Sequence, residues 1–226
     1  MIQKSEVCVL IPAYNEEKNI SAVVNAVRQD GFPVLVVDDG STDTSKEVIS
    51  TLGVEAILSP VNEGKGASLR KGLQWFLAKP FKAVILMDGD GQHAPHELDV
   101  FLKALNEGAD VVVGSRLWKP HGMPPIRLAT NRIMSWILSS VAGQKIEDTQ
   151  CGYRAFTRRA IESLHLGTNR FEVESEMLLD SAAHGYKIHS VPISSLYRDE
   201  VSHIRPGRDT VRFFSFLFRY ISKRKS

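Results

Sequence analysis

The sequence has 226 residues, 43% of them hydrophobic, and its 28 basic and 26 acidic side chains give a formal net charge of +2. This length and apolar content predict a globular protein with a real core, in one large domain or two small ones, and we expect no nucleic-acid partner. The total hides an asymmetry: residues 196–226 carry eight Lys or Arg against three Asp or Glu, which leaves the first 195 residues at −3. A basic tail of this kind indicates a partner that carries phosphate or anionic lipid.

The cysteines and the N-terminal segment predict a cytoplasmic protein. Cys8 lies in the apolar run VCVLI and is expected to be a buried free thiol, and Cys151 is far from it in sequence. Two distant cysteines form no disulfide framework, which suits a reducing compartment. The segment MIQKSEV has no hydrophobic signal core, and no apolar run reaches the ~20 residues that cross a bilayer. We therefore expect a cytoplasmic chain, either soluble or peripheral on the cytosolic membrane face.

The first half of the chain alternates between strand and helix patterns. Short runs that are apolar almost throughout are typical of parallel strands covered on both faces, and they occur at residues 7–12, 32–38, 54–58, 83–88 and 109–115. Amphipathic stretches between them predict helices at 16–29, 64–78 and 95–105. This order predicts an α/β fold, with a Rossmann-like, mostly parallel central sheet and helices on both faces.

The second half is less regular. After a proline-rich loop, residues 126–143 predict a helix whose polar residues Arg127, Asn131, Ser135 and Ser139 recur every four positions, and we expect this stripe to face water. A further helix is predicted near 171–185 and a short strand at 187–193. We expect residues 1–195 to form the main domain and residues 196–226 to form a basic, aromatic C-terminal loop and amphipathic helix.

Polar or glycine-rich segments follow all five predicted strands: AYNEE, DGSTDTS, SPVNEGKG, GDGQH and RLWKP. In a parallel sheet these segments meet at one edge, where ligands of such folds bind. Asp88 and Asp90 lie there one residue apart, between glycines. An acidic turn is one interpretation of this pair. Its position favours the other, a site for Mg²⁺ or Mn²⁺, which proteins hold with one or two carboxylates and the phosphates of a substrate.

Two other loops suggest a nucleotide ligand. In VDDGSTDTS, one of Asp38 and Asp39 can face the turn while the other accepts hydrogen bonds from a ribose hydroxyl or a base edge, although a plain turn and helix cap explains the segment equally well. In NEGKG (62–66), glycines and a lysine open a helix, which favours phosphate binding. His93 and His96 lack a zinc-like partner set and are expected to be loop residues.

Six segments, taken together, resemble the motifs of family 2 glycosyltransferases of the GT-A fold: VLIPAYNEEKNI, VVDDGSTDTS, NEGKGASLRKGL, MDGDGQHAPHEL, VVGSR and DTQCGYRAF. The most similar subgroup is that of the dolichyl-phosphate mannose synthase-like polyprenyl-phosphate glycosyltransferases. The resemblance runs from about Val7 to Val191. It implies a nucleotide-diphosphate sugar donor of the GDP-mannose or UDP-glucose type, a divalent metal and inversion at the anomeric carbon.

The resemblance also implies roles for individual residues. The nucleoside pocket would include Pro12, Tyr14, Glu16 and Asp39, and the donor site as a whole would add Asn62, Lys65 and Asp88. The metal and the diphosphate would meet Asp88, Asp90 and Gln92. Arg116 would meet the acceptor phosphate or the donor sugar, and Asp148 would lie close to the reacting centre, so we expect Asp90, Asp148 and Arg116 to be catalytic.

The nature of the acceptor decides which residues are needed. A polyprenyl phosphate is ionised near neutral pH and needs positive charge rather than a base, for which the candidates are Arg116, Arg127, Arg132, Arg198 and, beside the last, Ser202. A sugar hydroxyl would need a base, and Asp148 is then the candidate. A catalytically silent nucleotide- or lipid-binding module is a further alternative, which the intact pair of acids disfavours.

The C-terminal segment 208–226 bears on the acceptor. It combines aromatic and aliphatic residues with basic ones, as an interfacial helix on an anionic membrane does. A helix docked on the body with its aromatic residues in the core would have the same composition. In the segment 197–208, Val201 and His203 stand where the lipid-phosphate subgroup commonly has glycine and lysine.

Overall fold

The structure is a computed structural model and describes residues 1–118, 120, 122–168, 172–194 and 206–224. Its strands are β1 (Val7–Ala13), β2 (Val34–Asp38), β3 (Glu55–Leu58), β4 (Ala83–Leu86), β5 (Val111–Ser115), β6 (Arg154–Thr157) and β7 (Ile188–Pro192). Its α-helices are α1 (Ile20–Gln29), α2 (Ser45–Thr51), α3 (Lys65–Leu77), α4 (Leu98–Asn106), α5 (Pro125–Ala142), α6 (Arg158–Glu162), α7 (Glu172–Ala183) and α8 (Pro206–Arg224). Short 3₁₀ turns occupy Lys4–Glu6 and Pro95–Glu97.

The described strands form a single seven-stranded sheet in the order β3-β2-β1-β4-β6-β5-β7. All pairings are parallel except those of β6, which runs antiparallel to both β4 and β5. The predicted α/β fold with a mostly parallel sheet is therefore confirmed. Strand β6 was not predicted, because its four residues follow the polar loop 148–153 and carry no apolar run of their own.

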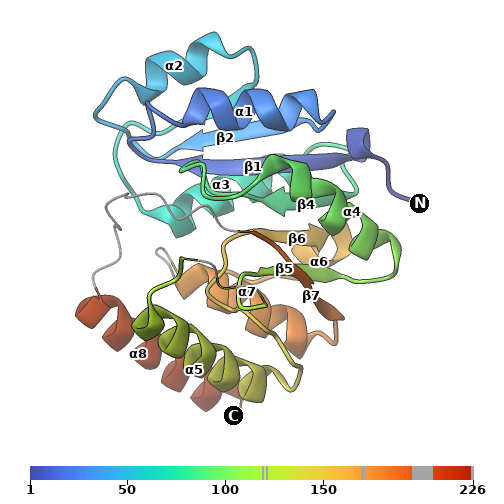
Figure 1. The fold of residues 1–226 in the computed structure, drawn as a ribbon, viewed down its shortest axis with the longest axis vertical. Coiled ribbons are helices and arrows are strands. Elements are labelled where there is room, and N and C mark those ends of the chain that lie inside the picture. The colour runs from blue at the N-terminus through green and yellow to red at the C-terminus, as the bar shows by residue number, and fades with distance from the viewer. Residues whose placement is uncertain (119, 121, 169–171, 195–205, 225–226) are drawn as a thin grey trace.

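The sheet has helices on both faces, as predicted (Figure 1). Side chains of β1 alternate between the two cores: Val7, Val9 and Ile11 pack with α1 and α4, whereas Cys8 and Leu10 pack with α3. The second core extends through α7 to α5 and α8, which lie at the end of the molecule opposite α2. The helices α5, α7 and α8 therefore extend the second core away from α2 (Figure 1).

The strand order indicates that a ligand would bind at the carboxyl ends of the neighbouring strands β1 and β4. The chain passes outward from β1 to β2 and β3, then returns to pair β4 on the other side of β1. Connections that leave adjacent strands in opposite directions open a crevice at the carboxyl ends of those strands. Asp88 comes two residues after the end of β4, so the paired acids lie at the carboxyl end of this strand.

Helix α5 corrects one expectation. The stripe of polar residues on this helix was expected to face water, but Asn131 and Ser135 are buried against the body. Trp136 and Ile133, on the opposite side of the helix, are exposed. The reason is that buried hydrogen-bonding groups of the loop 146–149 need partners, and the inner face of α5 supplies them.

Candidate active site

The loops that follow β1 and β2 are joined by hydrogen bonds and form one rim, at the carboxyl ends of the strands. The Oδ1 atom of Asp38 accepts hydrogen bonds from the backbone N–H groups of Gly40 at 3.1 Å and Ser41 at 3.0 Å. Ser41 Oγ accepts a hydrogen bond from the backbone N–H of Asn15 at 2.9 Å, and Asn15 Oδ1 accepts one from Thr42 N at 2.8 Å. Asn15 has φ of 57°, a left-handed conformation that asparagine tolerates. The predicted turn after β2 thus holds the residues that follow β1.

Asp39 fixes the next loop along the rim. Its two carboxylate oxygens accept hydrogen bonds from the backbone N–H groups of Glu63 at 2.9 Å and Gly64 at 2.8 Å. A Cβ atom at Gly40, which has φ of 72°, would lie 2.2 Å from the carbonyl carbon of Val61, so this contact of two loops requires glycine. Asp39 is buried and positions the loop that leads into α3. Its role at a nucleoside stays a prediction.

A lysine bridges two carboxylates at the start of α3. Lys65 Nζ lies 2.6 Å from Asp88 Oδ1 and 2.6 Å from Glu174 Oε1, the latter on α7. Burial opposes the charged form of Lys65, but the two carboxylates outweigh it and raise the lysine pKa. Burial likewise opposes ionisation of Asp88, but Lys65 outweighs it and lowers the aspartate pKa to about 2. Lys65 and Asp88 are therefore both ionised at neutral pH, and the lysine lies between the carboxylates of Asp88 and Glu174.

The loop 148–153 approaches this cluster closely. A Cβ atom at Gly152 would lie 2.7 Å from Asp88 Oδ2 and 3.3 Å from Glu174 Oε1, so the backbone reaches the acids only because this residue is glycine. Arg154, which is fully buried, holds the loop: its guanidinium donates hydrogen bonds to the carbonyl oxygens of Cys151 and Thr149, both at 2.8 Å. It also donates to the carbonyl oxygen of Glu174, which joins the loop to α7.

His93 lies next to the segment that carries the paired acids, Asp88 and Asp90. It is buried, its ring stacks on Tyr153 with centroids 4.8 Å apart, and its Nδ1 accepts a hydrogen bond from the backbone N–H of Asp88 at 3.3 Å. Burial lowers the pKa of His93 to about 4, against the opposing effect of Asp88, so the ring is neutral at pH 7. His93 is in a loop as predicted, and its hydrogen bond to Asp88 N holds the segment that carries Asp88.

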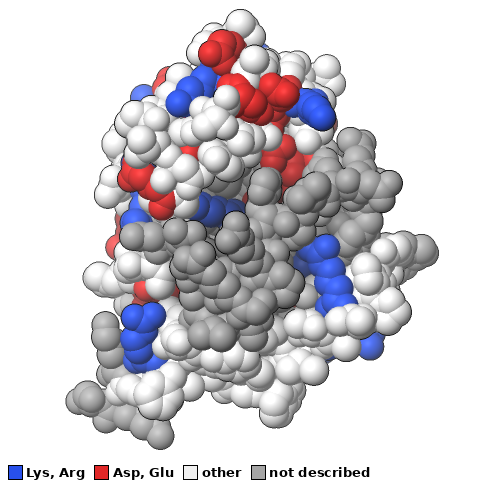
Figure 2. All heavy atoms as spheres, turned by 90° about the vertical axis from the view of Figure 1, so that its left-hand side faces the viewer, with Lys and Arg blue, Asp and Glu red and all other residues white. Residues whose placement is uncertain are grey.

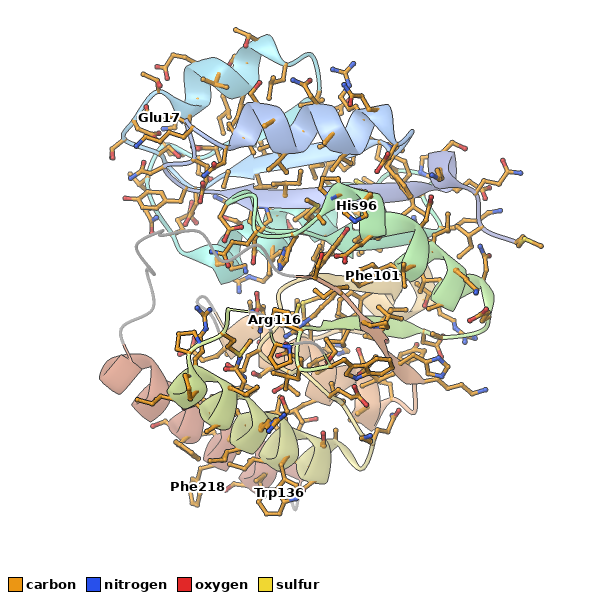
Figure 3. All side chains as sticks on the ribbon, viewed as in Figure 1. Glu17, His96, Phe101, Arg116, Trp136 and Phe218 are labelled. Carbon is orange, nitrogen blue, oxygen red and sulfur yellow. The ribbon has the colours of Figure 1, made fainter. Side chains whose placement is uncertain are left out.

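A second ion pair lies near these acids, since Arg116 contributes to lowering the pKa of Asp88. Arg116, which follows β5, donates hydrogen bonds from Nε to Asp148 Oδ2 at 2.8 Å and from a terminal nitrogen to Oδ1 at 3.1 Å. Gln150 N donates to Asp148 Oδ1 at 3.2 Å. Figure 3 shows Arg116 between the sheet and helix α5. Asp148 is fully buried and has donors on both oxygens, so it orients a cation at the site.

The remaining predicted residues have the following places. Pro12, Tyr14 and Glu16 are half-buried at the end of β1, Asn62 is exposed on the loop before α3, and Arg127 and Arg132 lie in the first half of α5. Asp90 accepts a hydrogen bond at 2.9 Å from the backbone N–H of Gln92, beside Asp88. Arg198 and Ser202 lie outside the described residues.

Sequence reasoning missed three residues of this site: Glu174, Arg154 and Gly152. Arg154 and Gly152 lie in the segment DTQCGYRAF, whose resemblance to a family motif marks the segment but not the role of each residue. Glu174 is 86 positions after Asp88, in a helix with several other acids. No pattern in the sequence distinguishes it from them.

The rim carries its charges unevenly. Figure 2 looks onto it from the left-hand side of Figure 1: Asp and Glu gather over the upper part, and the described residues of the lowest third show Lys or Arg without Asp or Glu. The lower part is formed by the end of the molecule that carries α5 and α8. This face of the molecule thus carries its acids mainly away from the end where α5 and α8 lie (Figures 1 and 2).

Three relatives share most of the chain. Glycosyltransferase AglJ of Haloferax volcanii is 34% identical over 94% of this chain and 71% of its own length. UDP-N-acetylglucosamine–dolichyl-phosphate N-acetylglucosaminyltransferase of Methanococcus voltae is 31% identical over 94% of this chain and 93% of its own length. Polyprenol monophosphomannose synthase of Mycolicibacterium smegmatis is 30% identical over 84% of this chain and 77% of its own length.

The fold is also that of a solved structure. Glucosyl-3-phosphoglycerate synthase from Mycobacterium tuberculosis, crystallised with Mn²⁺, uridine diphosphate and phosphoglyceric acid, superposes with a TM-score of 0.69, at 22% identity, over 86% of this chain and 71% of that chain. The sequence profile of Glycosyl transferase family 2 matches residues 8–164. With the sheet order, the acids after β4 and these relatives, the chain belongs to glycosyl transferase family 2 and is a glycosyltransferase of the GT-A fold.

Proposed function

We propose that this glycosyltransferase moves a hexose, with inversion, from a nucleotide-diphosphate sugar of the GDP-mannose or UDP-glucose type to a polyprenyl phosphate. The observation that carries the proposal is that two charge centres lie close together after strands β4 and β5 of the sheet, since Arg116 acts on the pKa of Asp88. The acids Asp88 and Asp90 follow β4, and the cation Arg116 is held by Asp148. With a dication bound to them the acids would match a donor diphosphate, and Arg116 would match an anionic acceptor.

The residues after β4 fit a dication. Asp88, Asp90 and Gln92 offer the hard oxygen atoms that Mg²⁺ or Mn²⁺ prefers, and they would hold the ion. No three His, Cys, Asp or Glu side chains of the described residues gather into a complete site, so substrate phosphates would have to complete the coordination. The relative that was crystallised with Mn²⁺ and uridine diphosphate supports this assignment. When bound, such an ion neutralises the charge that develops on the departing diphosphate.

The chain's own side chains complete the chemistry. Lys65, at the first turn of α3, places a fixed positive charge beside Asp88, where it would help to hold the donor's phosphates. Arg116 would draw the acceptor phosphate toward the anomeric carbon. The acceptor phosphate is already ionised, so it needs no base. Its oxygen would form a bond to the anomeric carbon while the bond from that carbon to the leaving diphosphate breaks.

The environment of Asp148 favours a phosphate acceptor over a hydroxyl. A hydroxyl acceptor needs a base with a free oxygen in reach. Asp148 is fully buried, and it accepts hydrogen bonds from Arg116 Nε, a terminal nitrogen of the same guanidinium, and the backbone N–H groups of Arg116 and Gln150. These contacts suit a residue that positions Arg116. The two relatives named for dolichyl phosphate and polyprenol monophosphomannose support the same class of acceptor.

The proposal places the reaction at the cytosolic membrane face, where the C-terminal helix would contact the surface. No helix in the described part of the chain is both long and apolar enough to cross a bilayer. One face of α8 packs on the body through Phe213, Phe216 and Leu217. The two interpretations of this helix therefore combine: it docks on the body and leaves its other face exposed.

A panel of donors tests the proposal. Release of nucleoside diphosphate from UDP- and GDP-sugars is measured with Mg²⁺, with Mn²⁺ and with EDTA, each with and without a polyprenyl phosphate. We expect release that requires both the metal and the lipid phosphate, with a glycolipid product. Transfer to hydroxyl acceptors alone would replace the proposed acceptor, and no release with any donor would favour a silent binding module.

A further inference from the structure

Helix α5 exposes large apolar side chains to solvent, although its buried side includes polar residues as well as Leu138 and Ala142. Ile126, Ile133 and Trp136 are 83%, 58% and 71% exposed. They follow a spacing of seven and three residues, which places them on one side of the helix. On the other side Asn131 and Ser135 are buried. A helix that only covers a soluble body does not gather three large apolar side chains on its outer side, so the outer side of α5 fits an apolar partner.

Helix α8 presents a similar face. Its residues Phe213, Phe216 and Leu217 are buried on the body, and Tyr220 Oη donates a hydrogen bond to the carbonyl oxygen of Leu179 in α7 at 2.9 Å. On the opposite side Phe214 and Phe218 are 47% and 74% exposed, four residues apart. The helix therefore lies along the body with one row of aromatic residues inward and another outward.

The two outward faces belong to the same end of the molecule. Both α5 and α8 pack on α7. Figure 3 shows Trp136 and Phe218 pointing away from the sheet at the end of the longest axis. We call the surface made by Ile126, Ile133, Trp136, Phe214 and Phe218 the α5–α8 outer face.

The charge of the two helices identifies what this surface fits. The segments 125–142 and 206–224 carry seven Lys or Arg and a single acid, Asp209, a net charge of +6 in a chain whose total is +2. Arg132 and Arg219, whose side chains are described, are both exposed. A surface that combines exposed aromatic residues with flanking basic ones and almost no acids complements a bilayer with anionic headgroups. Two copies of this chain would repel each other at the same surface.

We propose that the α5–α8 outer face docks on the interfacial region of an anionic lipid bilayer. The membrane contact thus includes α5, a helix of the main body, and is not confined to the C-terminal segment. Trp136 would lie at the level of the headgroups, where tryptophan side chains are enriched. Ile133 and Phe218 would reach the upper acyl chains, and the exposed side chains of Arg132 and Arg219 would contact the phosphates.

The inner face of α5 connects this surface to the site. Ser135 Oγ accepts a hydrogen bond from Thr149 N at 2.9 Å, and Ser139 Oγ donates to the carbonyl oxygen of Ile146 at 3.0 Å. The loop that carries Asp148, and through it Arg116, is thus fixed to the helix that meets the membrane. A helix with its side chains is ~10–12 Å across, so Arg116 would lie about one helix diameter above the headgroups. This step alone rests on the proposed function, because it supplies a reason for the site to face a lipid phosphate.

Vesicle binding by the full chain tests the surface without reference to catalysis. Co-sedimentation is measured with vesicles of phosphatidylcholine and with an equal mixture of phosphatidylcholine and phosphatidylglycerol. We expect binding to the mixture that weakens with added salt. Each of the double variants I133S/W136S and F214S/F218S should bind at least about tenfold more weakly, because each loses two inserted side chains. All four positions are exposed, so the variants should keep the wild-type melting temperature. Val100→Ser, an exposed apolar residue of α4, is the matched control and should bind as the wild type does.

Two outcomes overturn the inference. One is a wild-type chain that does not bind the mixed vesicles, or double variants that bind them as well as the wild type. The other is a lipid-free dimer that the same variants convert to a monomer, since the face would then be an interface between copies. Transfer assays separate this inference from the proposed function: I133S/W136S should lose transfer to a vesicle-embedded polyprenyl phosphate and keep it with a short-chain, dissolved prenyl phosphate. If the wild type transfers sugar to neither acceptor, the proposed function fails while the vesicle result still decides the surface.

Discussion

Asp148 holds Arg116 by both ends of its carboxylate. Arg116 Nε lies 2.8 Å from Oδ2 and a terminal guanidinium nitrogen lies 3.1 Å from Oδ1, and the backbone N–H of Arg116 adds a third contact at 3.2 Å. Two parallel hydrogen bonds between opposite charges fix the plane of the guanidinium as well as its position. The arginine side chain is 8% exposed and the aspartate is fully buried, so water does not compete for these contacts.

Asp148→Asn should therefore reduce both stability and transfer. Removal of one charge from a buried pair leaves the other uncompensated, and we expect the free energy of unfolding to fall by about 3–5 kcal/mol. A displaced guanidinium should slow transfer by about a hundredfold. Denaturant unfolding and initial rates of sugar transfer measure the two effects.

Arg116→Met and the double variant R116M/D148N give the control for this pair. With both charges removed, the loss of stability should be smaller than the sum of the single losses. A D148N protein that unfolds like the wild type but has no activity would contradict the positioning role and return Asp148 to the role of a base.

Gly152→Ala should impair the site with little effect on the fold. The new Cβ would lie 2.7 Å from Asp88 Oδ2, so that carboxylate must turn away from its place beside Lys65. A side-chain tip moves at little cost, and we expect a change in melting temperature of only a few degrees, about 1 kcal/mol or less. Transfer should fall at least about tenfold. Gly167→Ala, whose Cβ would make an ordinary contact at 3.6 Å, is the control; equal activity of both variants would show that the close approach has no function.

The regular part of the fold was predictable because the parallel strands β1, β2, β4 and β5 are buried almost throughout. An uninterrupted run such as Val7–Ala13 carries its own signal, and the polar segments after such strands marked the edge where the site lies. Strand β6 gave no such signal: its first residue, Arg154, is charged, yet it is fully buried because three backbone carbonyl oxygens accept its hydrogen bonds.

The sequence predicted those site residues that follow a strand. It did not predict contacts between site residues that lie on different helices and loops. Asp88 could be assigned from its position after β4. That Lys65 bridges it to Glu174 depends on how α3 and α7 pack on the same face of the sheet, which no local pattern contains. The prediction for helix α5 was wrong for a related reason. Its polar stripe was assigned to water because burial of Ser135 makes sense only once Thr149 is known to lie against it.

Asp90→Asn should abolish turnover and leave the fold intact. Asp90 is half-buried beside Asp88, and an amide keeps its size and its ability to accept the hydrogen bond from Gln92 N. What the variant loses is one negative charge at the proposed metal site. Release of nucleoside diphosphate and circular dichroism measure the two properties. Asp99→Asn, at an exposed acid paired with Lys4, is the control and should be fully active; full activity of D90N as well would remove Asp90 from the mechanism.

Both cysteines should be inert in the folded protein. Cys8 and Cys151 are buried free thiols, and burial raises the pKa of each to about 12. Because only the thiolate attacks disulfide reagents, no thiol should react at pH 8 in the native state, and raising the pH to 9 should change this little. Both should react once the chain is unfolded in denaturant. Titration with a chromogenic disulfide counts them in each state, and rapid reaction of a native thiol would contradict the placement of that residue.

Lys65→Met tests whether the lysine and a metal ion compete for the carboxylate of Asp88. Without the cation, Asp88 and Glu174 face each other as like charges, and we expect the free energy of unfolding to fall by about 1–3 kcal/mol in the presence of EDTA. A ligand that binds only the folded state stabilises it in proportion to its affinity. Mn²⁺ should therefore raise the melting temperature of Lys65→Met by more than that of the wild type, because no lysine competes for the carboxylate. Glu174→Gln is the matched variant: it leaves Lys65 on Asp88, and Mn²⁺ should stabilise it no more than the wild type. Equal stabilisation of all three proteins would show that Lys65 and the metal do not share Asp88.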